Sequence, residues 1–183
     1  MDHLIKDTLD SGFVGSRIIL RKLTPDDADN MFAYTSDAET CRYLGWGPHT
    51  DREQCVAFID AAIVRYQQPK DILWGIALSE DDVLIGVIRI YELTESSTTV
   101  SYILNRAYTG SGYMTEALCA IIDVCFRQLD KDAVIAYFVN ENQASQRVME
   151  RCGMRACDEY QQTENIKGKA YQLRKYKIGR DCK

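Results

Sequence analysis

A turn with two glycines is the segment of this chain most suited to bind a ligand. Gly110 and Gly112 lie between a strand-like run and a long amphipathic stretch, in Thr109-Gly110-Ser111-Gly112-Tyr113. A tight turn at a helix start leaves backbone N–H groups unpaired, and such groups bind phosphate. Glycines at a strand–helix turn also serve backbone geometry alone. The segment is neither a P-loop nor a complete dinucleotide-binding fingerprint, since no Gly-Lys-Ser/Thr and no third glycine follow.

Few side chains are available for metal or nucleophilic chemistry. Only two histidines occur, His3 near the N-terminus and His49 beside Pro48. The seven cysteines form no CxxC pair and lie mostly in apolar contexts, which favours buried free thiols over disulfides or zinc. A histidine-based triad and a multi-histidine metal site are nearly excluded, and we expect no metal.

The composition is that of a soluble globular protein. The chain has 183 residues, 46% hydrophobic and 27% charged, with a net charge of −5. This acidic balance argues against nucleic-acid binding and is compatible with a cationic substrate such as an amine. No apolar run approaches the ~20 residues of a membrane span, and the acidic start is not a signal peptide. We expect one cytoplasmic domain over residues 1–183, monomeric or homodimeric, with no membrane partner and a flexible extension at 1–15.

Hydrophobic periodicity predicts one central sheet with helices. The expected helices cover residues 24–36, 50–66, 114–129 and 142–152. The expected strands cover residues 17–21, 73–78, 83–93, 98–104, 133–139, 154–163 and 169–178. A helix joins strands 98–104 and 133–139, so these two strands should run parallel in an otherwise antiparallel sheet. The fold class is therefore α/β or α+β with a mixed sheet.

Two segments resemble motifs of the GNAT N-acetyltransferase superfamily. The stretch 102–118, which contains the glycine turn, is similar to its acetyl-CoA motif. The stretch 142–154 resembles the Asn-x-x-Ser helix of the Rim-type branch, which contains ribosomal-protein alanine acetyltransferases, and the opening Arg17-Ile18-Ile19-Leu20-Arg21 with Asp26-Asp27-Ala28 fits that branch. The resemblance covers roughly residues 16 to 178. It implies a GNAT fold, with a mixed and mostly antiparallel sheet, a parallel strand pair splayed at the CoA site, and helices on both faces.

The resemblance implies acetyl-CoA as the cosubstrate. The pantetheine arm would lie between the strand ending at Leu104 and its parallel neighbour near Val139, bonded as an added strand would be. The pyrophosphate would rest on the amides that open the following helix. Asn142 would bind the pantetheine arm, although an asparagine there also caps its own helix. The expected cofactor-binding residues are Ile103, Leu104, Gly110, Ser111, Gly112, Tyr113, Met114, Thr115 and Asn142.

Two positions depart from the wider superfamily. Ala107 stands where Gln or Arg often precedes the first motif glycine, with Arg106 one place earlier. Met149 stands where many members carry the tyrosine that protonates the departing thiolate. The Rim-type branch suggests Ser145 as the substitute, while a serine near a helix start is often only a local cap.

The acceptor side is less defined. Glu92, late in a hairpin strand, is our candidate for a water-relayed base, with an ordinary exposed carboxylate as the alternative. A peptide α-amine with a pKa near ~8 is partly neutral at cellular pH, so a site without a strong base suits an α-amine. Trp46 is the expected wall of the acceptor site, or else covers the edge of the core. Tyr43 and His49 share that ambiguity.

The sequence thus predicts an acetyl-CoA-dependent N-acetyltransferase. The acceptor would be a primary amine, on a protein N-terminus or a small molecule, that attacks directly in a ternary complex without a covalent enzyme intermediate or a metal. One alternative is a noncatalytic acyl-CoA-binding or sensor module, which Met149 favours. A nucleotide-binding α/β domain is a third reading.

Overall fold

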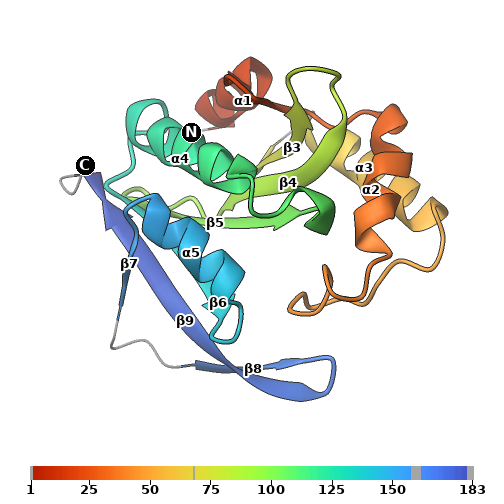
Figure 1. Cartoon of the computed structure of the whole chain (residues 1–183). Helices are drawn as coiled ribbons and strands as arrows, with labels where there is room; N and C mark the ends of the chain where they lie inside the picture. The colour runs from red at the N-terminus through yellow and green to blue at the C-terminus, as the bar shows by residue number, and fades with distance from the viewer. Residues whose placement is uncertain (1, 68, 158–161, 181–183) are drawn as a thin grey trace.

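The structure is a computed structural model, and it describes residues 2–67, 69–157 and 162–180. A twisted sheet runs through the described chain (Figure 1). Its strands are β1 (Phe13–Val14), β2 (Ile18–Arg21), β3 (Ile72–Leu78), β4 (Leu84–Tyr91), β5 (Ser97–Leu104), β6 (Ala133–Val139), β7 (Arg155–Ala156), β8 (Gln162–Ile166) and β9 (Lys169–Gly179). The order in space is β1-β2-β3-β4-β5-β6-β9-β7, with β8 also paired to β9. All pairings are antiparallel except β5 with β6, which confirms the predicted parallel pair.

Helices cover both faces of the sheet. They are α1 (Asp2–Ser11), α2 (Ala28–Thr35), α3 (Glu53–Arg65), α4 (Tyr113–Arg127) and α5 (Gln143–Arg151), with short 3-10 turns at Pro25–Asp27 and Arg106–Tyr108. Successive side chains of a strand point to opposite faces. Trp74 of β3 donates its indole N–H to Leu9 of α1, and its neighbour Leu73 lines a cavity beside α2 and α3. Helix α1 and the pair α2–α3 therefore lie on opposite faces.

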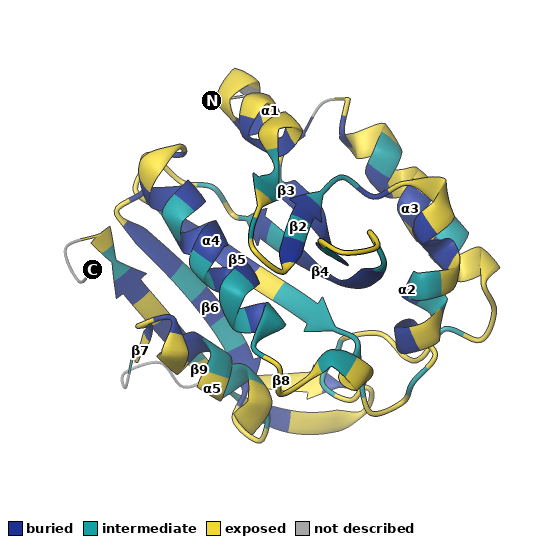
Figure 2. Cartoon of the chain, turned by 45° about the horizontal axis from the view of Figure 1, so that its top comes forward, coloured by how far each residue is buried: buried dark blue, intermediate teal, exposed yellow. Residues whose placement is uncertain are grey.

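The sheet opens between β5 and β6. These strands pair only from Ser97 with Ala133 to Val100 with Ala136. Beyond that point β5 stays paired to β4, and β6 stays paired to β9. The end of β5 is accordingly exposed or half-buried, whereas its residues 98–100 are buried (Figure 2). The expected splayed strand pair is present.

A glycine keeps the end of β5 close to β4. A Cβ on Gly86 would lie 2.4 Å from the carbonyl oxygen of Ile103. Only glycine allows that approach of the two backbones. The end of β5 is thus separated from β6 on one side and packed closely against β4 on the other.

The N-terminal segment differs from the expectation of a flexible extension at residues 1–15. Residues 2–11 form α1, in which Ile5 and Leu9 are buried against the sheet. Ile5, Thr8 and Leu9 follow the i, i+3, i+4 spacing of a helix that buries one face. This apolar stripe is the local sequence signal for α1.

Two element boundaries also differ. Helix α3 begins at Glu53 and not at residue 50, and before it Asp51 accepts from the Gln54 N–H and the Gln54 amide oxygen accepts from the Thr50 N–H. The expected strand over 154–163 is represented by β7 and β8, and its residues 158–161 lie outside the described part. Among the described residues, no helix has both the length and the apolar character needed to cross a bilayer.

Candidate functional site

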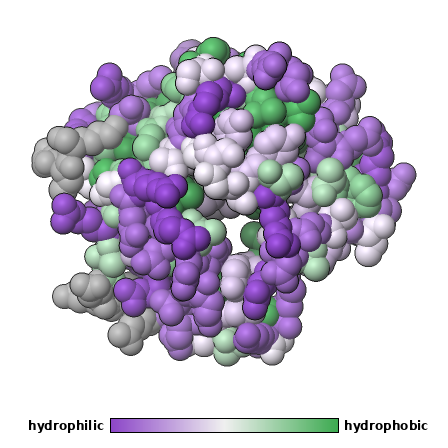
Figure 3. Space-filling model, in the orientation of Figure 1, coloured by the Kyte–Doolittle hydropathy of each residue, from purple (hydrophilic) through white to green (hydrophobic). Residues whose placement is uncertain are grey.

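The gap between β5 and β6 forms the first cavity, of about 730 Å³. Its walls come from the ends of both strands, the start of α4, α5, and the segment 39–44 after α2. Figure 3 shows the face hollowed at its centre, between α5 and the segment that follows α2. Of the nine expected cofactor-binding residues, eight line this cavity: Ile103, Leu104, Gly110, Gly112, Tyr113, Met114, Thr115 and Asn142. Ser111 lies in the same turn without lining it.

The glycine turn opens α4 in a conformation that favours glycine. Gly110 and Gly112 have φ angles of +86° and +84°, and Gly112 is the N-cap residue of α4 without a side-chain cap. The first N–H groups of a helix have no intrahelical partner, and they carry the positive end of its dipole. This end of the cavity is therefore suited to an anion.

Arg17, which directly precedes β2, forms hydrogen bonds with this turn and with α4. Its guanidinium donates to the Ser111 carbonyl oxygen at 2.8 Å and to the Glu116 carboxylate at 2.8 Å. The same group lies 5.0 Å from the ring centroid of Tyr113. Arg17 thus ties the turn and the first turn of α4 together, a role that the sequence analysis did not foresee.

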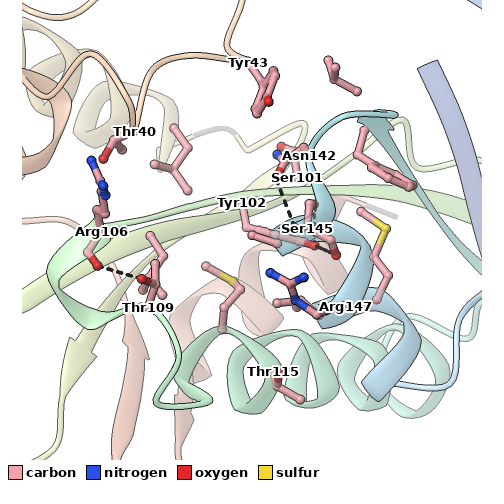
Figure 4. Close-up of a pocket in the computed structure, with 18 of the residues that line it drawn as sticks. Thr40, Tyr43, Ser101, Tyr102, Arg106, Thr109, Thr115, Asn142, Ser145 and Arg147 are labelled. Carbon is pink, nitrogen blue, oxygen red and sulfur yellow. Dashed lines mark hydrogen bonds between the residues drawn. The ribbon is translucent and has the colours of Figure 1, made fainter. Parts of the chain in front are cut away.

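Arginines collect at the cavity although the whole chain is acidic. Arg106, Arg147 and Arg151 all line it, and Figure 4 shows the first two on the segment after β5 and on α5. Guanidinium groups bind phosphate oxygens with fixed geometry. Arg106 therefore brings a cation to the cleft even though Ala107 occupies the usual position of the motif's side chain.

The hydroxyl groups of Tyr102 and Ser145 meet at the base of this cavity (Figure 4). The phenol oxygen lies 2.9 Å from Ser145 Oγ and donates to the Ser145 carbonyl oxygen at 3.2 Å. Burial raises the pKa of Tyr102 above its ordinary value, so this phenol keeps its proton at neutral pH. Tyr102 lies two residues beyond the last pairing of β5 with β6, where the strands separate. Tyr102 was not among the site residues predicted from the sequence.

The other predicted residues take different places. Asn142 caps α5, because its side-chain oxygen accepts from the Ser145 N–H at 3.2 Å. Met149 is buried and lines the cavity. Glu92 lies outside the lining of both cavities, with its carboxylate bonded to the Thr99 hydroxyl at 2.8 Å. The structure therefore brings Ser145 and Asn142 together and leaves Glu92 apart from them.

A second cavity, of about 380 Å³, lies beside α2 and α3. It shares Leu44, Ser101, Tyr102 and Ile103 with the first cavity. The remaining lining is largely apolar and consists of Met31, Tyr34, Thr35, Trp46, His49, Phe58, Leu73, Val87 and Arg89. The two cavities thus meet at the end of β5.

Aromatic side chains mark the second cavity. Trp46 and Phe58 are each 38% exposed and both line it, so large apolar surfaces face an open space there. The buried hydroxyl of Tyr34 has no hydrogen-bond partner among the described residues. The charge of Arg89 is offset by Asp71, whose carboxylate accepts from Arg89 Nε at 2.6 Å. This lining suits an apolar ligand with one hydrogen-bonding group.

His49 contributes the imidazole of the second cavity. Its ring stacks on Trp46 with centroids 4.9 Å apart and planes at 26°. Nδ1 lies 3.1 Å from Cys55 Sγ. Burial lowers the pKa of His49, so the ring is neutral at neutral pH.

Comparison with known proteins identifies the family. Residues 17–155 match the acetyltransferase (GNAT) domain. The chain belongs to this family. It is similar to the uncharacterized N-acetyltransferase YoaA of Bacillus subtilis, with 27% identity over 164 residues that cover 88% of this chain and 93% of YoaA.

Solved structures share the GNAT fold. A GNAT-family acetyltransferase from Bacillus anthracis superposes with a TM-score of 0.81 at 24% identity, covering 93% of this chain and 99% of that one. RimL, a ribosomal-protein acetyltransferase solved with coenzyme A, has a TM-score of 0.78 at 20% identity, covering 93% and 98%. The mixed sheet with one parallel pair is therefore a GNAT fold, and the protein is an acetyl-CoA-dependent N-acetyltransferase.

Proposed function

We propose that this GNAT domain moves an acetyl group from acetyl-CoA to a primary amine by direct attack in a ternary complex. The observation that carries the proposal is the meeting of two unlike cavities. One has an anion-binding helix start and arginines, the other is apolar, and both are bordered by Ser101, Tyr102 and Ile103. Reactants entering from the two sides would meet at these three residues.

The first cavity suits coenzyme A. The edge of β5 beyond Val100 has no strand partner on the β6 side, so residues 101–104 offer backbone groups to an extended amide chain such as pantetheine. The N–H groups at Gly112 to Thr115 suit the pyrophosphate. The volume of about 730 Å³ is in the range of cofactor sites. RimL binds coenzyme A in a chain of the same fold.

Tyr102 is the group best placed to protonate the departing CoA thiolate, with Ser145 as its partner. The amine nitrogen would bond to the acetyl carbon as the C–S bond breaks, the sulfur would take the phenol proton, and the amine would give up one proton to a base or to solvent. A proton from solvent would then return to Tyr102 through the Ser145 hydroxyl, whose Oγ lies 2.9 Å away. A thiol with a pKa near ~8.5 leaves readily, so this acid needs to contribute only modestly. Glu92 has no part in the proposal, because it borders neither cavity.

The second cavity suits the acceptor. Its apolar lining and the pairing of Arg89 with Asp71 favour an amine on an aromatic or aliphatic body over a polycation. An N-terminal α-amine beside an apolar side chain and an apolar small-molecule amine both fit that description. Membership of the Rim-type branch is part of this proposal and rests on the sequence motifs and on the likeness to RimL.

A thiol-release screen tests the proposal. Acetyl-CoA is incubated with the protein and with 2-phenylethylamine, peptides with apolar N-termini, spermine or an aminoglycoside. We expect release above background with the apolar amines and little with the polycations. Saturable CoA binding without release on any acceptor would support the noncatalytic sensor instead. Tight ATP binding without CoA binding would favour the nucleotide-binding reading.

A further inference from the structure

The ring of His49 is held at the second cavity by contacts from three segments. Its backbone N–H donates to the Thr35 carbonyl oxygen at 2.9 Å, which fixes the loop against the end of α2. Trp46 stacks on one face of the ring. Nδ1 faces Cys55 of α3, and Nε2 has no hydrogen-bond partner in the described part of the chain. The ring is thus fixed while one nitrogen stays available.

A chain of hydrogen bonds determines which nitrogen carries the proton. The Thr35 hydroxyl donates its single proton to the Met31 carbonyl oxygen at 2.9 Å. Thr35 Oγ1 lies 3.3 Å from Cys55 Sγ and can only accept there, so the Cys55 thiol donates to it. The sulfur then accepts from His49 at 3.1 Å. Nδ1 is therefore the protonated nitrogen, and Nε2 keeps a lone pair.

The opposite arrangement is less favourable. If Cys55 donated to His49 Nδ1, the sulfur and Thr35 Oγ1 would face each other at 3.3 Å without a proton between them. Burial raises the pKa of the Cys55 thiol, so the sulfur keeps its proton and remains a partner in the chain. The tautomer of a histidine is set by the partner of its other nitrogen, and here that partner is fixed.

The surroundings keep the ring neutral. Burial lowers the pKa of His49, and the carboxylate of Asp51 opposes this shift without cancelling it. Three further ionisable groups line the same cavity. Tyr34 and Tyr102 are phenols whose pKa values burial raises, and Arg89 is bonded to Asp71. His49 is consequently a neutral imidazole at neutral pH, able to accept a proton at Nε2.

We propose that His49 is the general base of the transfer, with Cys55 and Thr35 as positioning residues. As the amine nitrogen bonds to the acetyl carbon, one amine proton passes to His49 Nε2. The C–S bond breaks, and the Tyr102 phenol donates its proton to the departing sulfur. The inference rests on the proposed function and adds the base that the sequence analysis sought at Glu92.

Nitrogen NMR of the imidazole tests the tautomer without any substrate. The chain has two histidines, and His3 lies on α1 with an exposed side chain, so the His3→Gln variant leaves His49 as the only imidazole. We expect protonated Nδ1 and unprotonated Nε2, with a titration midpoint below the ordinary ~6.5. Adding Cys55→Ala removes the acceptor and should shift the tautomer toward Nε2–H, whereas Cys55→Ser keeps an acceptor and should preserve it. An Nε2–H tautomer in the protein with Cys55 intact would overturn the positioning argument.

Kinetics tests the role in catalysis, with 2-phenylethylamine as the probe. We expect His49→Gln to lower kcat about 100-fold or more, as loss of a general base does. Binding of CoA should stay unchanged, because His49 does not line the first cavity. The wild-type kcat should fall as pH drops through the lowered pKa of His49, and the variant should lack this acidic limb. A kcat within twofold of wild type, or a retained limb, would overturn the proposal.

The two proposals fail in different ways. A wild-type protein that binds CoA and acetylates no amine contradicts the proposed function. An active wild type with an equally active His49→Gln variant contradicts only the role of His49.

Discussion

Tyr102 on β5 and Ser145 on α5 hold their hydroxyl oxygens 2.9 Å apart, although 43 positions separate them in the chain. The contact joins β5 to α5 just beyond the point where β5 and β6 cease to pair. The two hydroxyl groups lie at the base of the first cavity. Met149 lines the same cavity, at the position where many members of the superfamily carry a tyrosine. The proton donor that we propose therefore depends on the fold and not on a single helix motif.

Removing the phenol hydroxyl tests this pair. We expect Tyr102→Phe to lower kcat about tenfold, less than the usual ~10²–10⁴ of general-acid effects, because a thiolate leaves readily. CoA affinity should be nearly unchanged. The pKa of Tyr102 is raised by burial, so the wild type should show no loss of kcat from phenol ionisation below pH ~10. Steady-state kinetics from pH 6 to 9.5 measures both, and an unaltered kcat in Tyr102→Phe would remove the tyrosine from the mechanism.

Gly112 provides a test of the anion site. Gly112→Val forces a β-branched residue to φ near +84°, which costs about 1–2 kcal/mol or distorts the turn. Its new Cβ would meet only Arg17 at 3.5 Å, so the damage comes from the backbone and not from a clash. We expect CoA affinity by calorimetry to fall about tenfold.

Gly168 supplies the matched control for that substitution. It has φ +81° and open space around it, in the turn between β8 and β9. Gly168→Val should lose similar stability and keep CoA affinity. Equal affinities in both variants would count against the glycine turn as the phosphate site.

Phe58 tests the apolar second cavity. Phe58→Ala should raise the KM for 2-phenylethylamine about tenfold, since burying part of an aromatic surface is worth about 1–2 kcal/mol. Val64→Ala is the control, because Val64 is 71% exposed on the same helix and outside the cavity. Substrate-saturation curves for the two variants give the comparison. A KM that changes equally in both would show that the second cavity does not hold this acceptor.

The packing of α1 has a consequence for stability. Leu9 is 1% exposed and Leu4 is 42% exposed on the same helix. Leu9→Ala should lower the free energy of unfolding by about 3 kcal/mol, while Leu4→Ala should change it by less than about 0.5 kcal/mol. Urea denaturation measures both. A similarly small loss of unfolding free energy in both variants would indicate that α1 contributes little to the folded state. It would support the expectation of a flexible extension at residues 1–15.

Much of the fold was predictable from local patterns. The apolar run 133–139 has the length and uniformity of a central strand and is β6. The glycine turn opens α4, and the Asn142 cap opens α5, at the expected places. These elements are specified by periodicity and capping within a few residues of sequence. The α1 stripe is equally local, but the polar residues that surround it make the N-terminal segment resemble a flexible extension.

The residues that line the first cavity were more predictable than those of the second. The glycine turn and strand ends of the first cavity are contiguous motifs, so sequence spacing could point to them. Tyr102 and Ser145 come from elements that only the folded sheet brings together, whereas His49 and Cys55 meet across the short loop that leads into α3. The sequence predicts Glu92 within a strand, but β4 ends at Tyr91, which pairs with Thr99 in the part of β5 that is still paired with β6. Long-range contacts of this kind leave no periodic signal in the chain.

Amine-dependent release of CoA tests the central claim most directly. Acetyl-CoA and 2-phenylethylamine are incubated with the wild-type protein, thiol is followed with time, and the amine is weighed by mass spectrometry. We expect one acetylated amine for each thiol released, and no release above background without amine. Bound CoA with no amine-dependent thiol and no acetylated product on any apolar amine would contradict it.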